Sequence, residues 1–147
     1  MSRGYACIGL YNPKNSANVG AALRAAHCLW ADMVAIQGRR FQRVPTDTTK
    51  AWRHMPLIQT NDLRSIIPYA CVPVAVEIVP GAYDLAIYHH PERAFYVFGP
   101  EDGSIPASAL AWCREVVQIP TRYCLNLGAT VNVVLYDRAA KQARSEP

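Results

Sequence analysis

Short apolar runs alternate with segments of helical periodicity along most of the chain. Strand-like runs fall at Tyr5–Leu10, Met33–Ile36, Ala70–Glu77, Ala94–Phe98 and Glu115–Gln118. They lack a strict polar alternation, which indicates strands that are buried on both faces of a sheet. Helix-like segments lie between and after them, at about Ala17–Trp30, Asp62–Ile67, Pro106–Cys113 and Leu125–Ala143. This alternation predicts an α/β fold in which a parallel sheet is flanked by helices.

The first and last helical segments differ in clarity. In the first, helical spacing predicts a buried stripe made of Val19, Ala22, Leu23, Ala26 and Trp30. Asn15 or Ser16 can cap its start. The last segment contains TVNVVLY at 130–136, which is rich in β-branched residues and would also fit a strand. Its length and polar tail favour a helix.

Composition is that of one globular domain spanning residues 1–147, with 51% hydrophobic and 18% charged residues. No apolar run approaches the ~20 residues that span a bilayer. The N-terminal sequence lacks the pattern of a signal peptide. The five cysteines are odd in number and form no CxxC pair. We interpret them as reduced thiols of a cytoplasmic protein, with neither a disulfide framework nor a metal site.

Positive charge is concentrated in the first half of the chain. Residues 1–73 carry nine Lys or Arg against three Asp, whereas residues 74–147 carry six against eight Asp or Glu. The basic surplus is densest at 38–55, which holds Arg39, Arg40, Arg43, Lys50 and Arg53 with two aromatic residues among them. Cations suit phosphates and rings stack on unpaired bases, so these five residues are candidates for RNA binding. A solvated loop is the alternative interpretation.

Three loops carry polar residues beside apolar segments. The asparagine-rich turn at 12–18 opens a helix, where amides, backbone N–H groups and Arg24 could meet a phosphate or a hydroxyl group. The loops GPEDGSIP at 99–106 and IPTRYCLN at 119–126 each follow a strand, where open α/β sheets bind ligands. A capped helix and tight turns are the structural alternatives. Cys124 has no acid–base partner nearby in the sequence, so a thiol that packs or lines a cofactor is favoured over a nucleophile. His89 and His90 precede a proline and are expected to be exposed turn residues.

Taken in order, the three segments resemble the motifs of the SpoU/TrmH branch of the SPOUT methyltransferases. The NxGxxxR motif is matched by Asn18, Gly20 and Arg24, and the FGxExxG-like motif by Phe98, Gly99, Glu101 and a shifted Gly103. The third motif is matched by Ile119, Pro120, Leu125 and Asn126. Cys124 stands where the family has serine, and Glu77 stands where a threonine-like residue is more usual.

The resemblance implies a C-terminal trefoil knot, S-adenosylmethionine as cofactor, a homodimer, and methylation of a ribose 2′-OH in tRNA or rRNA. The short chain resembles the minimal TrmL-like type, which acts on the tRNA wobble nucleotide. Carried over by motif, the expected catalytic residues are Arg24, Asn18, Glu101 and Asn126. The expected cofactor residues are Val76, Glu77, Gly99, Ile119, Cys124 and Leu125. Two alternatives stay open at this point: a non-catalytic RNA-binding or assembly factor, and a flavodoxin-like nucleotide-binding domain.

Overall fold

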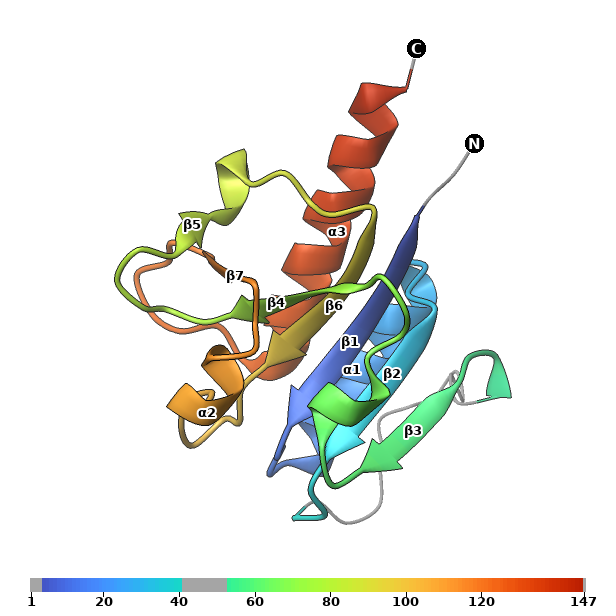
Figure 1. The fold of residues 1–147 in the computed structure, drawn as a ribbon, viewed down its shortest axis with the longest axis vertical. Helices are drawn as coiled ribbons and strands as arrows, with labels where there is room; N and C mark the ends of the chain where they lie inside the picture. Colours follow the sequence, from blue (N-terminus) through green and yellow to red (C-terminus); the bar gives the residue numbers. More distant parts are fainter. Residues whose placement is uncertain (1–3, 41–52, 147) are drawn as a thin grey trace.

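The computed structural model describes residues 4–40 and 53–146, which form a parallel β-sheet flanked by helices (Figure 1). The strands are β1 (Tyr5–Tyr11), β2 (Met33–Gln37), β3 (Leu57–Thr60), β4 (Val72–Val76), β5 (Tyr83–Asp84), β6 (Arg93–Phe98) and β7 (Glu115–Gln118). The helices are α1 (Ser16–Cys28), α2 (Ala107–Leu110) and α3 (Leu127–Ser145), with 3-10 turns η2 (Leu63–Ile66) and η3 (Leu85–Ile87). The strand order is β3-β2-β1-β6-β4-β7-β5, and all pairs are parallel. The α/β class is therefore confirmed.

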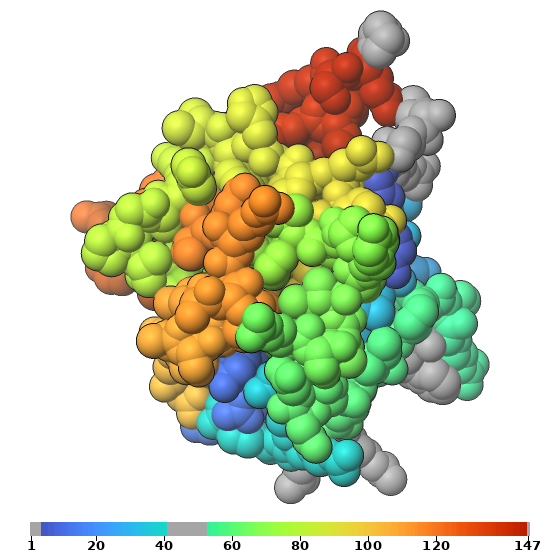
Figure 2. All heavy atoms as spheres, in the orientation of Figure 1, coloured from blue at the N-terminus to red at the C-terminus, as the bar shows by residue number. Residues whose placement is uncertain are grey.

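Each face of the sheet is covered by different segments, as expected for strands that are apolar on both sides. The long helices α1 and α3 pack on one face, over a core that includes Ile8, Leu10 and Tyr96. The other face buries Cys7, Phe95 and Ala75 beneath η2 and α2. Figure 2 shows this second side, where residues 60–76 and 104–118 lie next to each other. No helix in the described part of the chain is long and apolar enough to cross a membrane.

The helices α1 and α3 approach each other closely and are capped by asparagines. Asn15 accepts a hydrogen bond from the backbone N–H of Ala17 (2.8 Å), which confirms one of the two expected caps. A Cβ added to Gly128 would lie 2.6 Å from the Cβ of Ala21, so α3 needs glycine at this contact. The β-branched segment at 130–136 lies within α3, because packing against α1 outweighs its strand propensity.

Several predictions of local structure were wrong. The edge strands β3 and β5 were missed, since both are short and partly exposed. The segment Asp62–Ile67 forms only a 3-10 turn. Pro106–Cys113 contains only the four-residue helix α2. Trp30 lies beyond the end of α1 with φ +61° and is 56% exposed, so it does not continue the buried stripe.

A buried polar network joins α3 to the segment before β6. The side chain of His90 is 3% exposed, with Nδ1 2.7 Å from the Tyr96 hydroxyl and Nε2 2.7 Å from Asp137, so the expectation that His90 is exposed was wrong. A neutral imidazole satisfies both contacts, by donating to Asp137 and accepting from Tyr96. Burial lowers the pKa of His90 despite the opposing effect of Asp137, which favours this neutral form.

Candidate functional site

A cavity of about 410 Å³ lies at the carboxyl ends of β4, β6 and β7, three neighbouring strands of the sheet. Parallel strands end at one edge, so the loops that follow them meet there. The walls come from these loops and from the starts of α1 and α3. Its lining includes Asn18, Val76, Glu77, Phe98, Gly99, Glu101, Gln118, Ile119, Thr121, Cys124, Leu125, Asn126 and Thr130. The combination of apolar walls with amide, carboxylate and backbone groups suits a ligand of nucleoside size.

The six residues predicted to bind a cofactor all line this cavity: Val76, Glu77, Gly99, Ile119, Cys124 and Leu125. The side chain of Glu77 braces the cavity wall, because its two oxygens accept from the backbone N–H groups of Ile78 (2.9 Å) and Ile105 (3.0 Å). A Cβ on Gly99 would lie 3.1 Å from the nitrogen of Ile105, so the backbone is tightly packed there. The structure brings these residues together, and their binding of a cofactor stays a prediction.

The predicted Asn18 and Glu101 meet at one side of the cavity, although 83 residues separate them. The Glu101 carboxylate accepts from the backbone N–H of Lys14 at 2.7 Å and from the Asn18 amide at 3.4 Å. This contact joins the turn that opens α1 to the loop after β6. Both residues line the cavity and both are at least partly accessible to solvent.

Asn126 has a structural role that the sequence did not predict. Its side-chain oxygen accepts from the backbone N–H of Ala129 at 2.8 Å, so Asn126 caps α3 as Asn15 caps α1. The cap fixes the end of the loop 119–126, in which Thr121 donates to the backbone oxygen of Tyr123 (2.7 Å). Cys124 is exposed in this loop and lines the cavity.

Arg24 lies on α1 outside the cavity lining. It is exposed and stands six residues beyond Asn18, roughly 9 Å along the helix axis. Asn18 lines the cavity and Arg24 does not. Arg24 can therefore contact a group that approaches from outside the cavity, rather than a molecule bound inside it.

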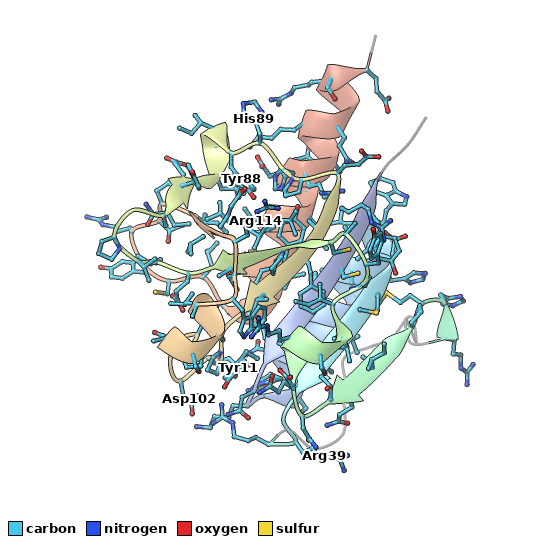
Figure 3. The ribbon with its side chains drawn as sticks, viewed as in Figure 1. Tyr11, Arg39, Tyr88, His89, Asp102 and Arg114 are labelled. Carbon is cyan, nitrogen blue, oxygen red and sulfur yellow. The ribbon has the colours of Figure 1, made fainter. Side chains whose placement is uncertain are left out.

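The candidate RNA-binding residues do not share one environment. Arg39 and Arg53 are exposed, whereas Arg43 and Lys50 lie outside the described residues. Arg40 is bound within the protein: its guanidinium donates to both oxygens of Asp102 at 2.8 and 2.9 Å, and to the backbone oxygen of Asn12 at 2.7 Å. Arg39 and Asp102 lie at the end of the molecule toward which the arrows of β1, β2 and β3 point (Figure 3).

Asp102 should give the stability of the protein a specific pH dependence. The Arg40 guanidinium lowers the pKa of this carboxyl from 3.8 to about 2. Because the folded pKa is below the ordinary value, the pair contributes fully above pH 3.8 and its contribution is lost as the pH falls toward about 2. In urea unfolding across this window, Asp102→Asn is expected to reduce the loss of stability seen in the wild type. Parallel curves for the two proteins would contradict the pairing.

Sequence reasoning missed Asp102, Lys14, Thr121 and Thr130. Asp102 was detectable as a second acid beside Glu101, but its partner lies 62 residues away and no local pattern marks the pairing. Thr121 lies within the third motif, Thr130 follows it, and both line the cavity. Among the described residues, no cluster of three His, Cys, Asp or Glu side chains could hold a metal ion.

Comparison with known proteins identifies a matching family and several solved structures with the same fold. The profile of the SpoU rRNA Methylase family matches residues 5–136. The SpoU methyltransferase AviRb from Streptomyces viridochromogenes, solved with AdoMet, superimposes with a TM-score of 0.83 at 17% identity, over 97% of this chain and 62% of its own. A protein from a structural study of the 2-OH methylation of C/U34 on tRNA gives a TM-score of 0.81 at 21% identity, over 95% of this chain and 92% of its own.

A third structure, the TrmH/SpoU tRNA modifying enzyme of A. aeolicus, gives a TM-score of 0.82 at 13% identity, over 95% of this chain and 76% of its own. At these identities the likeness establishes the fold. The chain spans about three fifths of the length of AviRb. A search of curated proteins found no match.

Proposed function

We propose that this chain, which belongs to the SpoU rRNA methylase family, methylates a ribose 2′-OH of RNA. S-adenosylmethionine is the cofactor of this family. The observation that carries the proposal is the single cavity in which residues of all three motifs meet. The alternative of a flavodoxin-like nucleotide-binding domain is excluded by the family match, which covers residues 5–136.

The cavity fits S-adenosylmethionine in size and chemistry. Val76, Ile119 and Leu125 offer apolar walls for a purine, while Gly99 and Cys124 bring the loop backbone to the surface of the cavity. When bound, this cofactor supplies an electrophilic methyl group on a sulfonium. Glu77 holds two of the wall segments through the backbone of Ile78 and Ile105. Cofactor binding therefore depends on the positions of these loops. The cap that Asn126 forms on α3 fixes the end of the loop 119–126.

In the proposed mechanism, residues of α1 contact the ribose and phosphate of the RNA. Asn18 and Glu101 stand at the boundary between the cavity and the solvent-facing side of the helix, where they can place the ribose. Arg24 binds the adjacent phosphate and stabilises charge that develops on the 2′ oxygen. A guanidinium has too high a pKa to be a general base, so Arg24 contributes orientation and electrostatic stabilisation, and the 2′-OH proton leaves to solvent water.

We further propose that the substrate is a tRNA, and that the wobble ribose is its target. The support is the likeness to the protein studied for C/U34 methylation, which spans nearly the whole of both chains. Arg39 and Arg53 are exposed, and Arg43 and Lys50 belong to the same basic stretch of sequence, which suits phosphates.

A homodimer and a C-terminal trefoil knot belong to the same proposal. A groove of about 680 Å³ runs between the end of α1, η3 and α3, lined by Leu29, Val133, Tyr136 and others. Tyr136 is 65% exposed and Val133 is 37% exposed on this face, an apolar patch that a second copy would cover. Sedimentation of the wild type and of Tyr136→Glu tests the dimer, which the charge should weaken.

The decisive experiment combines cofactor titration with mapping of modified nucleotides. Calorimetry should detect S-adenosylmethionine binding to the purified protein. Incubation with tRNA from cells that lack the gene should then restore a 2′-O-methyl group at one position. Binding of RNA without any binding of the cofactor would favour the non-catalytic alternative. Transfer to rRNA alone would contradict the tRNA assignment but would leave the methyltransferase proposal standing.

A further inference from the structure

Three loops that follow three neighbouring strands converge on the guanidinium of Arg40. Asn12 comes directly after β1, Arg40 comes shortly after β2, and Asp102 lies in the loop after β6. The strand order places β1 between β2 and β6, so one side chain spans all three strand ends. Arg40 was predicted as an RNA contact, and this environment points to a different role.

The turns after β1 and β2 are in direct contact beneath the guanidinium. Gly38 has φ +98°, and a Cβ there would lie 2.6 Å from the side-chain oxygen of Asn12. Asn12 itself has φ +48° and donates its backbone N–H to the oxygen of Gln37 at 2.7 Å. These two turns therefore form a fixed base, and Arg40 extends from it to the loop after β6.

The loop after β6 is held at two consecutive acids. Asp102 accepts both hydrogen bonds of the Arg40 fork, while Glu101 accepts from the backbone of Lys14 and the amide of Asn18. A second cation, the Lys14 ammonium, lies 4.0 Å from Asp102. Glu101 lines the cavity and Asp102 does not, so the Arg40–Asp102 pair acts on the site through its neighbour.

We propose that the Arg40–Asp102 pair is a positioning device, which holds the loop of Glu101 against the turn that opens α1. The pair thereby sets the distance between the cavity wall that contains Glu101 and helix α1, which would contact the RNA. The bidentate face of the guanidinium, which a phosphate would need, is occupied by Asp102. This proposal rests on the methyl-transfer function proposed above.

The two roles predict different effects of Asp102→Ala on kcat. If Arg40 is a phosphate contact, removal of the acid frees it, so RNA binding strengthens and kcat is unchanged. If the pair positions the loop, kcat falls by about 10- to 100-fold, because small misplacements are costly in a transfer step. In that case the Kd for RNA does not rise. Arg40→Lys separates the roles again, since lysine keeps the charge and loses the fork.

The experiment compares Asp102→Ala, Arg40→Lys and Arg40→Ala with a substitution of the adjacent arginine, Arg39→Ala. Positioning predicts that the first three lower kcat to a similar extent. Arg39→Ala should instead weaken RNA binding and reduce its salt slope by about 1. The exchanged pair Arg40→Asp with Asp102→Arg should recover part of kcat. An unchanged kcat in Asp102→Ala would overturn the proposal.

A second measurement does not depend on activity. Hydrogen exchange at residues 11–18 and 99–104 should accelerate together in Asp102→Ala, since the amide of Lys14 loses its protected position beside Glu101. Unchanged exchange in both segments would overturn the positioning role even if the wild type proved inactive. Absence of methyl transfer by the wild type would contradict the proposed function alone.

Discussion

Arg24→Ala is expected to lower the rate of methyl transfer by about 10²–10³-fold while leaving cofactor affinity unchanged. Loss of one group that stabilises developing charge has effects of this size. The separation of the two properties follows from geometry, because Arg24 lies beyond Asn18 on α1 and does not line the cavity. Single-turnover transfer of a labelled methyl group measures the first property, and calorimetry with S-adenosylmethionine measures the second.

Arg24→Lys is the matched control for this prediction. It retains the positive charge but cannot present two parallel N–H donors to a phosphate, so an intermediate rate is expected. Unfolding curves of both variants measure any change of stability separately from the change of rate. Full activity of Arg24→Ala would remove Arg24 from the mechanism. A parallel loss of cofactor binding would show that Arg24 acts on the cavity itself.

The site could be predicted from the sequence because its parts are local and the sheet brings them together. Gly99 and Glu101 directly follow β6, Ile119 directly follows β7, and Asn18 opens α1. Gly99, Glu101 and Asn18 are glycine or polar residues next to apolar segments, and Ile119 is the apolar residue that begins the loop after β7. Once a parallel sheet is inferred, its shared carboxyl edge places these loops at one side of the sheet, and the strand order β6-β4-β7 makes them neighbours.

What the sequence could not provide is the partner of each charged group. Arg39 and Arg40 are adjacent, both exposed and alike in local pattern, yet Arg40 binds an acid 62 residues away. His90 likewise follows His89 in an apparent turn but is buried against Asp137. Such pairings are set by tertiary contacts, whereas hydrophobic periodicity reports only which face of an element is buried.

The same limit applies to secondary structure at the edges of the sheet. The strand β3 pairs with β2 alone and has alternating partly buried positions, so its apolar signal is weak. In α3, by contrast, the strand-favouring β-branched residues at 130–136 adopt a helix, because Gly128 allows α3 to approach α1. Tertiary packing decided both cases against local propensity.

Arg138→Met is expected to lower the free energy of unfolding by about 2–5 kcal/mol. Arg138 is the one charged residue that is buried among the described residues, at 4% exposed. Its guanidinium donates to the backbone oxygens of Pro91 (2.6 Å) and Glu92 (2.7 Å) and to the Tyr96 hydroxyl (3.1 Å). Methionine fills similar space but leaves the Pro91 oxygen without this donor, at a cost of about 1–3 kcal/mol. The Glu92 oxygen keeps the backbone N–H of Tyr5 (2.9 Å), so the lost bonds to Glu92 and Tyr96 cost less, about 0.5–1.5 kcal/mol each. Urea unfolding measures the difference.

Tyr96→Phe separates the carbonyl contacts from the rest of the network. It removes a hydroxyl that is bonded to His90 and Arg138 but leaves the two backbone oxygens satisfied, so a smaller loss of about 1 kcal/mol is expected. If Arg138→Met is no more destabilising than Tyr96→Phe, the Pro91 oxygen must find another donor. In that case α3 would be held to the sheet by its apolar contacts with α1, and the guanidinium would serve only to satisfy the tyrosine.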